Sequence, residues 1–215
     1  YALSSVQTTN SSTAVGNEAL SSSTGEQNTA FGYQALRSNS TANQNVAMGF
    51  EASMTNQTGT GNTAVGYLTM SANTTGHSNV AVGRSALDAN TTGSNNVGLG
   101  RDALGSSTTA SNNVAVGQDS LYTLTTGTGN AVLGTAAARG MTTGNYNTVM
   151  GQEALKANTT ASNNTAVGYQ AGLNVTTGTL NTLVGSGAGG TATMTGSENN
   201  LLGYIAGRNI TSGQY

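Results

Sequence analysis

The residues best suited to acid–base or ionic chemistry are Asp102 and Asp119, which lie 17 residues apart in the sequence. If the chain repeats with that period, the two carboxylates lie about 5 Å apart in adjacent repeats. Such a pair can raise a carboxyl pKa or hold a cation. Arg84 and Arg101 have the same 17-residue separation beside them. We therefore expect a solvated ion-pair cluster rather than an active site.

Two other patterns resemble known chemical motifs. Gly185, Gly187 and Gly190 have the spacing of a dinucleotide-binding loop, G-x-G-x-x-G. That loop works between a strand and a helix, and no such unit is predicted around these glycines. His77 is the only histidine and follows a glycine in a turn-like sequence, so we expect a lone exposed side chain. The sequence predicts no catalytic residue, no cofactor and no metal site.

The chain is an array of one repeated unit, seen clearly in the residues NTAVGYQA of 164–171. The glycine of this unit recurs every 17 residues from Gly32 to Gly185, with a first step of 16 from Gly16 and a last step of 18 to Gly203. A fixed short period is the sequence signature of a solenoid. We therefore treat 1–215 as a single repeat array without domain boundaries.

Each repeat, or coil, has 17 columns, counted from the asparagine that begins it as column 0. Column 3 is apolar in every coil, column 7 is small, column 8 is mostly leucine, and column 4 is glycine. Charged residues fall in columns 5, 6 and 9, which must therefore face water. Ala2 and Leu3 already occupy columns 7 and 8, and Thr211–Tyr215 stops before the next asparagine. We expect a segment of a longer chain with both ends inside a coil.

Repeated glycine, β-branched threonine and asparagine argue against helix. We expect two short strands and two turns per coil, the second turn at column 14, in a parallel β-solenoid (β-roll) of about 12 coils. At roughly 4.8 Å per coil the array is about 55 Å long. We expect one coil to bury only a valine (column 3, as at Val167), a leucine (column 8) and two alanines. So thin a core leads us to expect several chains around a common axis, with columns 2 and 7 buried between them.

Composition excludes several functional classes. The formal net charge is −2, so no basic surface is predicted for nucleic acid or for a membrane. The chain has no cysteine, which removes disulfide and thiolate chemistry. No apolar run approaches the roughly 20 residues needed to span a bilayer.

The unit NTAVGYQAL, followed by NTTG, resembles the head repeats of trimeric autotransporter adhesins. It is also similar to repeats of phage tail fibres and surface proteins that end in a self-cleaving chaperone domain. The resemblance implies a left-handed β-roll, a homotrimer and an extracellular place on a cell surface or virion. It implies a structural or adhesive fibre segment that binds a host-surface or matrix molecule, with a glycan as one candidate. The 17-residue coil departs from the shorter unit of the adhesin heads.

Two surfaces are candidates for contact. Aromatic residues interrupt the polar column 5 and form the predicted contact residues: Tyr33, Phe50, Tyr67, Tyr169 and Tyr204. Threonine pairs fill columns 12 and 13 in seven successive coils, from Thr74-Thr75 to Thr176-Thr177. A threonine ladder on a solenoid suggests an ice-binding (antifreeze) protein as the alternative function. Adjacent residues of a strand point to opposite faces, so only one of the two columns could face ice.

Column 11 carries asparagines in the acceptor triplet for N-linked glycans, N-x-S/T. In a host that glycosylates, they would be acceptors, and otherwise they are turn residues. They are Asn39, Asn56, Asn73, Asn90 and Asn158.

Overall fold

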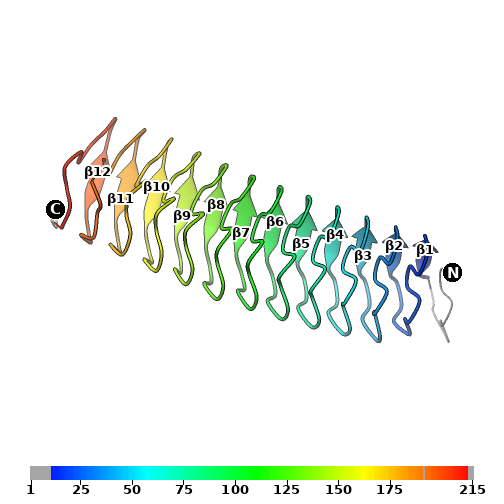
Figure 1. The fold of residues 1–215 in the computed structure, drawn as a ribbon. Helices are drawn as coiled ribbons and strands as arrows, with labels where there is room; N and C mark the ends of the chain where they lie inside the picture. Colours follow the sequence, from blue (N-terminus) through cyan, green and yellow to red (C-terminus); the bar gives the residue numbers. More distant parts are fainter. Residues whose placement is uncertain (1–10, 191, 213–215) are drawn as a thin grey trace.

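The computed structural model describes residues 11–190 and 192–212, so Ala2, Leu3 and 213–215 lie outside the described residues. The chain forms a row of similar coils with the N- and C-terminal ends at opposite ends of the row (Figure 1). Each coil contributes one three-residue strand to a single parallel sheet, in which the strands follow sequence order. The parallel β-solenoid predicted from the period is therefore confirmed. The strands are β1 (Thr13–Val15), β2 (Thr29–Phe31), β3 (Val46–Met48), β4 (Thr63–Val65), β5 (Val80–Val82), β6 (Val97–Leu99), β7 (Val114–Val116), β8 (Ala131–Leu133), β9 (Thr148–Met150), β10 (Thr165–Val167), β11 (Thr182–Val184) and β12 (Asn200–Leu202).

The strand register follows the repeat. Thr165 pairs with Thr182, one period further on, and the same columns pair between all the strands. The 16-residue step from Thr13 to Thr29 and the 18-residue step from Thr182 to Asn200 keep this register. The changes in repeat length are therefore absorbed outside the strands.

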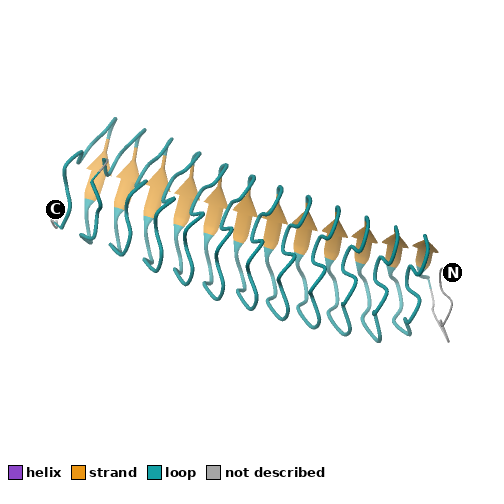
Figure 2. Cartoon of the chain, in the orientation of Figure 1, coloured by secondary structure: helices purple, strands orange, loops and turns teal. Residues whose placement is uncertain are grey.

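The prediction of a second strand in each coil is wrong for the described residues, where the remainder of each coil is loop and turn (Figure 2). The second side of the coil still bonds to its neighbour. The backbone N–H groups of Thr74 and Thr75 both donate to the carbonyl of Thr91, at 2.9 and 3.1 Å. A strand ladder needs a separate carbonyl for each such donor, so this pairing holds the coils together without forming a sheet.

The interior of the coil is filled by columns 2, 7 and 8. Ala166, Ala171 and Leu155 are typical members and are fully buried. The expectation that columns 2 and 7 form an outer surface is therefore wrong. Because side chains alternate along a strand, burying column 2 turns columns 1 and 3 outward, so Val82 and Leu133 are exposed.

A ladder of buried asparagines runs along the axis at column 0. The Oδ1 atom of Asn164 accepts the backbone N–H of Asn181 at 2.9 Å and its Nδ2–H at 3.1 Å. The Nδ2 group of Asn164 donates to the carbonyl of Gly178 at 3.0 Å. Each side chain thus ties two coils together and closes its own coil. This supplies polar binding energy that the thin apolar core lacks.

Column 4 glycine is required by close approach between coils. Gly100 has φ of +132°, and a Cβ atom there would lie 2.7 Å from the carbonyl carbon and oxygen of Gly117. Columns 6 and 8 also have left-handed backbone without glycine, as at Asp102 (φ 56°) and Leu104 (φ 54°). This conformation costs free energy for ordinary residues, so stacking against identical neighbours must offset it in every coil.

Candidate functional site

The first candidate surface is the outer face of the sheet, formed by columns 1 and 3 and called here the β-face. It carries no charged residue in any of the twelve strands. Its exposed apolar side chains are Val15, Phe31, Met48, Val80, Val82, Val114, Leu133, Met150 and Leu202. The strands lie along one side of every coil, so this face is continuous along the row (Figure 2).

The β-face contains a shallow groove across β7, β8 and β9. The groove has a volume of about 250 Å³ and is lined by Val114, Leu133 and Met150 among other apolar residues of these strands. Leu133 is 45% exposed and Met150 is 49% exposed. An exposed, uncharged surface with a continuous row of apolar side chains is typical of an interface with another chain.

The predicted aromatic contact residues fall into two groups. Tyr33, Phe50 and Tyr67 stack in three successive coils, with ring centroids 5.1 and 5.3 Å apart. Tyr169 and Tyr204 lie two coils apart near the other end, and both are exposed. All five side chains reach solvent, as expected for contact residues. Stacking covers both faces of the Phe50 ring and one face each of Tyr33 and Tyr67, whereas Tyr169 and Tyr204 have Ser186 in the coil between them.

The acidic pair forms the predicted ion-pair cluster. Asp102 lies 3.4 Å from Arg84 and 3.5 Å from Arg101. Asp119 lies 3.9 Å from both Arg101 and Arg139, and Arg139 was not anticipated from the sequence. Both carboxylates therefore have cationic partners, at the long end of ion-pair distances and partly exposed. Such pairs contribute little to stability and leave no free acid or base.

Two carboxyl groups have shifted pKa values for reasons that are structural. The side-chain hydrogen bond from Lys156, at 2.6 Å, and a second from Gln170 lower the pKa of Glu153. Partial burial raises the pKa of Asp88, against hydrogen bonds from the backbone. Neither group belongs to a metal-binding cluster, since the described residues contain no group of three His, Cys, Asp or Glu able to hold a metal ion.

The two threonine columns differ in exposure. Hydroxyl groups of column 12 donate to carbonyls of the next coil, as from Thr74 to Thr91 and from Thr91 to Thr108, both at 3.0 Å. The threonines of column 13 are exposed to solvent, as at Thr75, Thr92 and Thr109. One file of threonines therefore faces water, as the alternation of side chains predicts.

The structure contradicts the glycan-acceptor hypothesis for column 11. All five asparagines, Asn39, Asn56, Asn73, Asn90 and Asn158, are completely buried. The first four form a second internal ladder: Asn73 donates to the Oδ1 atom of Asn56 at 2.9 Å and to the carbonyl of Gly76 at 3.0 Å. The side-chain amide of each asparagine lies inside the coil, so a glycan attached to it would displace core residues.

The remaining motifs are placed as expected. His77 is exposed in a loop. Gly185, Gly187 and Gly190 occupy columns 4, 6 and 9 of an ordinary coil, with no helix beside them in the described chain. The described residues also contain no helix long and apolar enough to cross a membrane. Comparison of the chain with protein-family models, with curated proteins and with solved structures gives no match.

Proposed function

We propose that this chain is a rigid segment of an extracellular homotrimeric fibre, the shaft or head of a surface adhesin or viral tail fibre. The observation that carries the proposal is the uncharged apolar β-face. Exposed patches of this kind on soluble chains are usually covered by a partner. The left-handed winding and the trimeric state follow from the resemblance of the repeat to adhesin heads.

A second and a third copy of the same chain are the best-matched partners for the β-face. Its columns repeat with the spacing of the coils, so an identical chain offers apolar side chains at the same intervals. Homo-oligomers with rotational symmetry satisfy this match at every coil. The predicted interface is therefore columns 1 and 3, in place of columns 2 and 7.

The proposed role is mechanical and adhesive. Successive coils are joined by backbone hydrogen bonds, by the column 0 asparagine ladder and by a continuous core. These contacts favour stiffness along the axis. Repetition of the surface also favours weak binding at many equivalent places, with avidity from their number. An enzyme needs unlike groups that converge on one point, whereas Asp102 and Asp119 are each paired with arginines.

Sedimentation velocity of the purified chain tests the assembly. We expect a species of three times the chain mass of 21.3 kDa. A stable folded monomer at micromolar concentration would remove the argument from the β-face. Turnover of a polysaccharide or peptide that is lost in Asp102→Asn or Asp119→Asn would contradict the non-enzymatic role.

Ice binding is the second candidate, favoured by the exposed file of column 13. The hydroxyls of these threonines have no hydrogen-bond partner within the described part of the chain, unlike those of column 12. A folded monomer that shows thermal hysteresis on a cold stage would support this candidate over the fibre. We expect a trimer without thermal hysteresis.

A further inference from the structure

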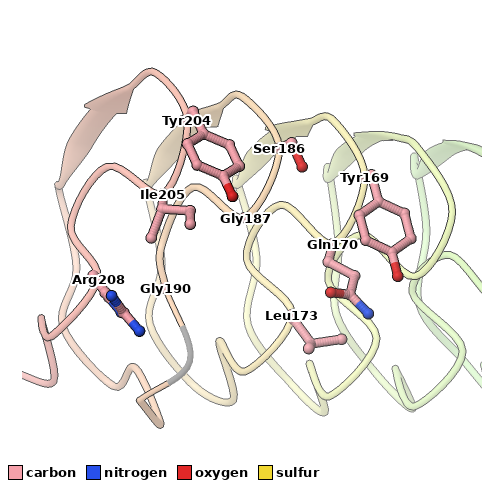
Figure 3. Close-up of a pocket in the computed structure, with 9 residues that line it drawn as sticks. All are labelled: Tyr169, Gln170, Leu173, Ser186, Gly187, Gly190, Tyr204, Ile205 and Arg208. Carbon is pink, nitrogen blue, oxygen red and sulfur yellow. The ribbon is translucent and has the colours of Figure 1, made fainter.

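Three successive coils near the end of the described chain line a cavity of about 210 Å³ that is open to solvent (Figure 3). Its lining residues come from columns 5, 6 and 9 of these coils. In the middle coil the three columns hold Ser186, Gly187 and Gly190, which are small. The cavity therefore exists because one coil lacks the side chains that its two neighbours carry.

The walls of the cavity are mainly aromatic and aliphatic. Tyr169 and Leu173 lie on one side, and Tyr204 and Ile205 lie on the other (Figure 3). Known sites for drug-sized ligands have volumes of about 300–1,000 Å³, so this cavity fits a smaller group, such as one six-membered ring. Tyrosine offers such a ring an apolar face with a polar hydroxyl at its tip.

The polar groups of the cavity favour an anion. Arg208 lines it, and the structure gives this guanidinium no carboxylate partner among the described residues, whereas Arg84 and Arg139 each have one. None of the nine lining residues is acidic. The nearby carboxylate of Glu153 is already paired with Lys156 at 2.6 Å.

One side-chain amide and one hydroxyl group complete the lining. Gln170 donates one N–H to Glu153 at 2.8 Å, which leaves its carbonyl oxygen and second N–H for other partners. Ser186 adds a hydroxyl between the two tyrosines. A ligand with several hydroxyl groups would use these donors and acceptors, whereas an aromatic hydrocarbon ring would leave them and Arg208 unpaired.

We propose that this cavity binds one pyranose ring of an acidic saccharide, with the apolar face of the ring against tyrosine and its carboxylate on Arg208. The proposal names a ligand class for the adhesive role and rests on that role. The cavity lies on columns 5, 6 and 9 and not on the β-face. Saccharide binding and chain assembly can therefore be measured and can fail separately.

Ser186→Tyr is the variant that closes the cavity. Column 5 already holds tyrosine at Tyr33 and Tyr67, where three aromatic rings in successive coils stack at 5.1 and 5.3 Å. The new ring is therefore compatible with the coil. Thr135→Tyr is the matched control, because Thr135 is exposed in the same column away from the cavity.

Saturation-transfer NMR with methyl glucuronoside and methyl glucoside, on the full chain, tests the proposal. The wild-type chain and Thr135→Tyr are expected to bind the glucuronoside, and Ser186→Tyr to lose the signal. Arg208→Gln is expected to weaken glucuronoside binding about threefold and to remove the preference over glucoside, as for an exposed ion pair.

Equal signals from wild type and Ser186→Tyr would overturn the site, and equal binding of the two glycosides by wild type would overturn the role of Arg208. Sedimentation of the same samples separates the two proposals. A monomer that binds the glucuronoside contradicts the fibre assembly alone, and a trimer that does not bind it contradicts the saccharide site alone.

Discussion

Asn113 and Asn130 stand one coil apart and share two hydrogen bonds. The Oδ1 atom of Asn113 accepts both the backbone N–H and the Nδ2–H of Asn130, each at 3.0 Å. On its other side, Asn113 donates its own backbone N–H and Nδ2–H to the Oδ1 atom of Asn96, at 3.1 and 3.3 Å. One buried side chain therefore links three coils.

We expect Asn113→Ala to destabilise the chain by about 3 kcal/mol, because it leaves buried donors of Asn130 without an acceptor. The shift in the urea midpoint, followed by circular dichroism, measures this loss. Gln118→Ala is the control, since Gln118 carries the same amide group on the exposed surface of the same coil. Equal midpoints for the two variants would show that the ladder does not hold the coils together.

Gly100→Ala is expected to cost more than about 4 kcal/mol or to prevent folding, because its Cβ would lie 2.7 Å from the backbone of Gly117. Gly187→Ala is the contrasting variant. Its Cβ would meet only Cγ1 of Ile205 at 3.4 Å, and alanine already occupies that column at Ala136 with φ of 53°. We expect a change within about 1 kcal/mol there. Thermal unfolding of the two variants measures this difference. Similar losses of stability would show that close approach of the coils is not the reason for glycine at column 4.

The double variant Leu133→Glu, Met150→Glu places two carboxylates in adjacent strands of the β-face, at side chains that are 45% and 49% exposed. We expect the proposed trimer to dissociate, because burying unpaired charges at an interface is costly. Sedimentation velocity measures the mass, and circular dichroism reports whether the dissociated chain stays folded. Thr109→Glu, on exposed column 13, should leave the mass unchanged. A trimer that survives the double variant would place the interface elsewhere.

Asp88→Asn is expected to stabilise the chain slightly at neutral pH. Burial raises the pKa of Asp88 above its ordinary value of 3.8, so the folded chain binds this proton more tightly than the unfolded chain. Stability is therefore lost as pH rises from below 3.8 through the raised pKa, and the full cost is present at pH 7. We expect a gain in melting temperature on the order of 1 °C at pH 7 and a smaller one at pH 3.

Asp119→Asn provides the comparison for this effect, because that side chain lies near Arg101 and Arg139. Removing its charge should not raise the melting temperature at pH 7. A gain of the same size in both variants would point to overall charge instead of the burial of Asp88.

The sequence alone predicted the coil, its period and the parallel pairing, because the same residue types return every 17 positions and stack on themselves. It also predicted the surface position of charged columns, as at Asp102 and Arg101, since unpaired burial of charge is unfavourable. The column 4 glycines were identified from recurrence alone. The structure supplied the reason, which is the approach of Gly100 to the backbone of Gly117.

The direction of the side chains was decided only by the tertiary structure. In a three-residue strand, either the column 2 or the column 3 side chain can point into the core. From the sequence, the larger Val167 was expected there instead of Ala166.

Column 8 residues such as Leu155 fill much of the interior from the other side, so column 2 is alanine in most coils. Val132 and Leu183 are buried at column 2 in coils where column 8 is the smaller Ala138 or Gly189. Column 2 therefore faces inward, and the apolar side chains of column 3 belong to the β-face.

The buried asparagines have the same kind of explanation. An isolated Asn73 is polar and looks like a surface turn residue with a glycan-acceptor triplet. Burial of its amide is favourable only when Asn56 and the carbonyl of Gly76 are brought within hydrogen-bonding distance, at 2.9 and 3.0 Å. Those partners come from another coil and from a turn, so the hydrogen bonds that make burial possible exist only once the coils have stacked.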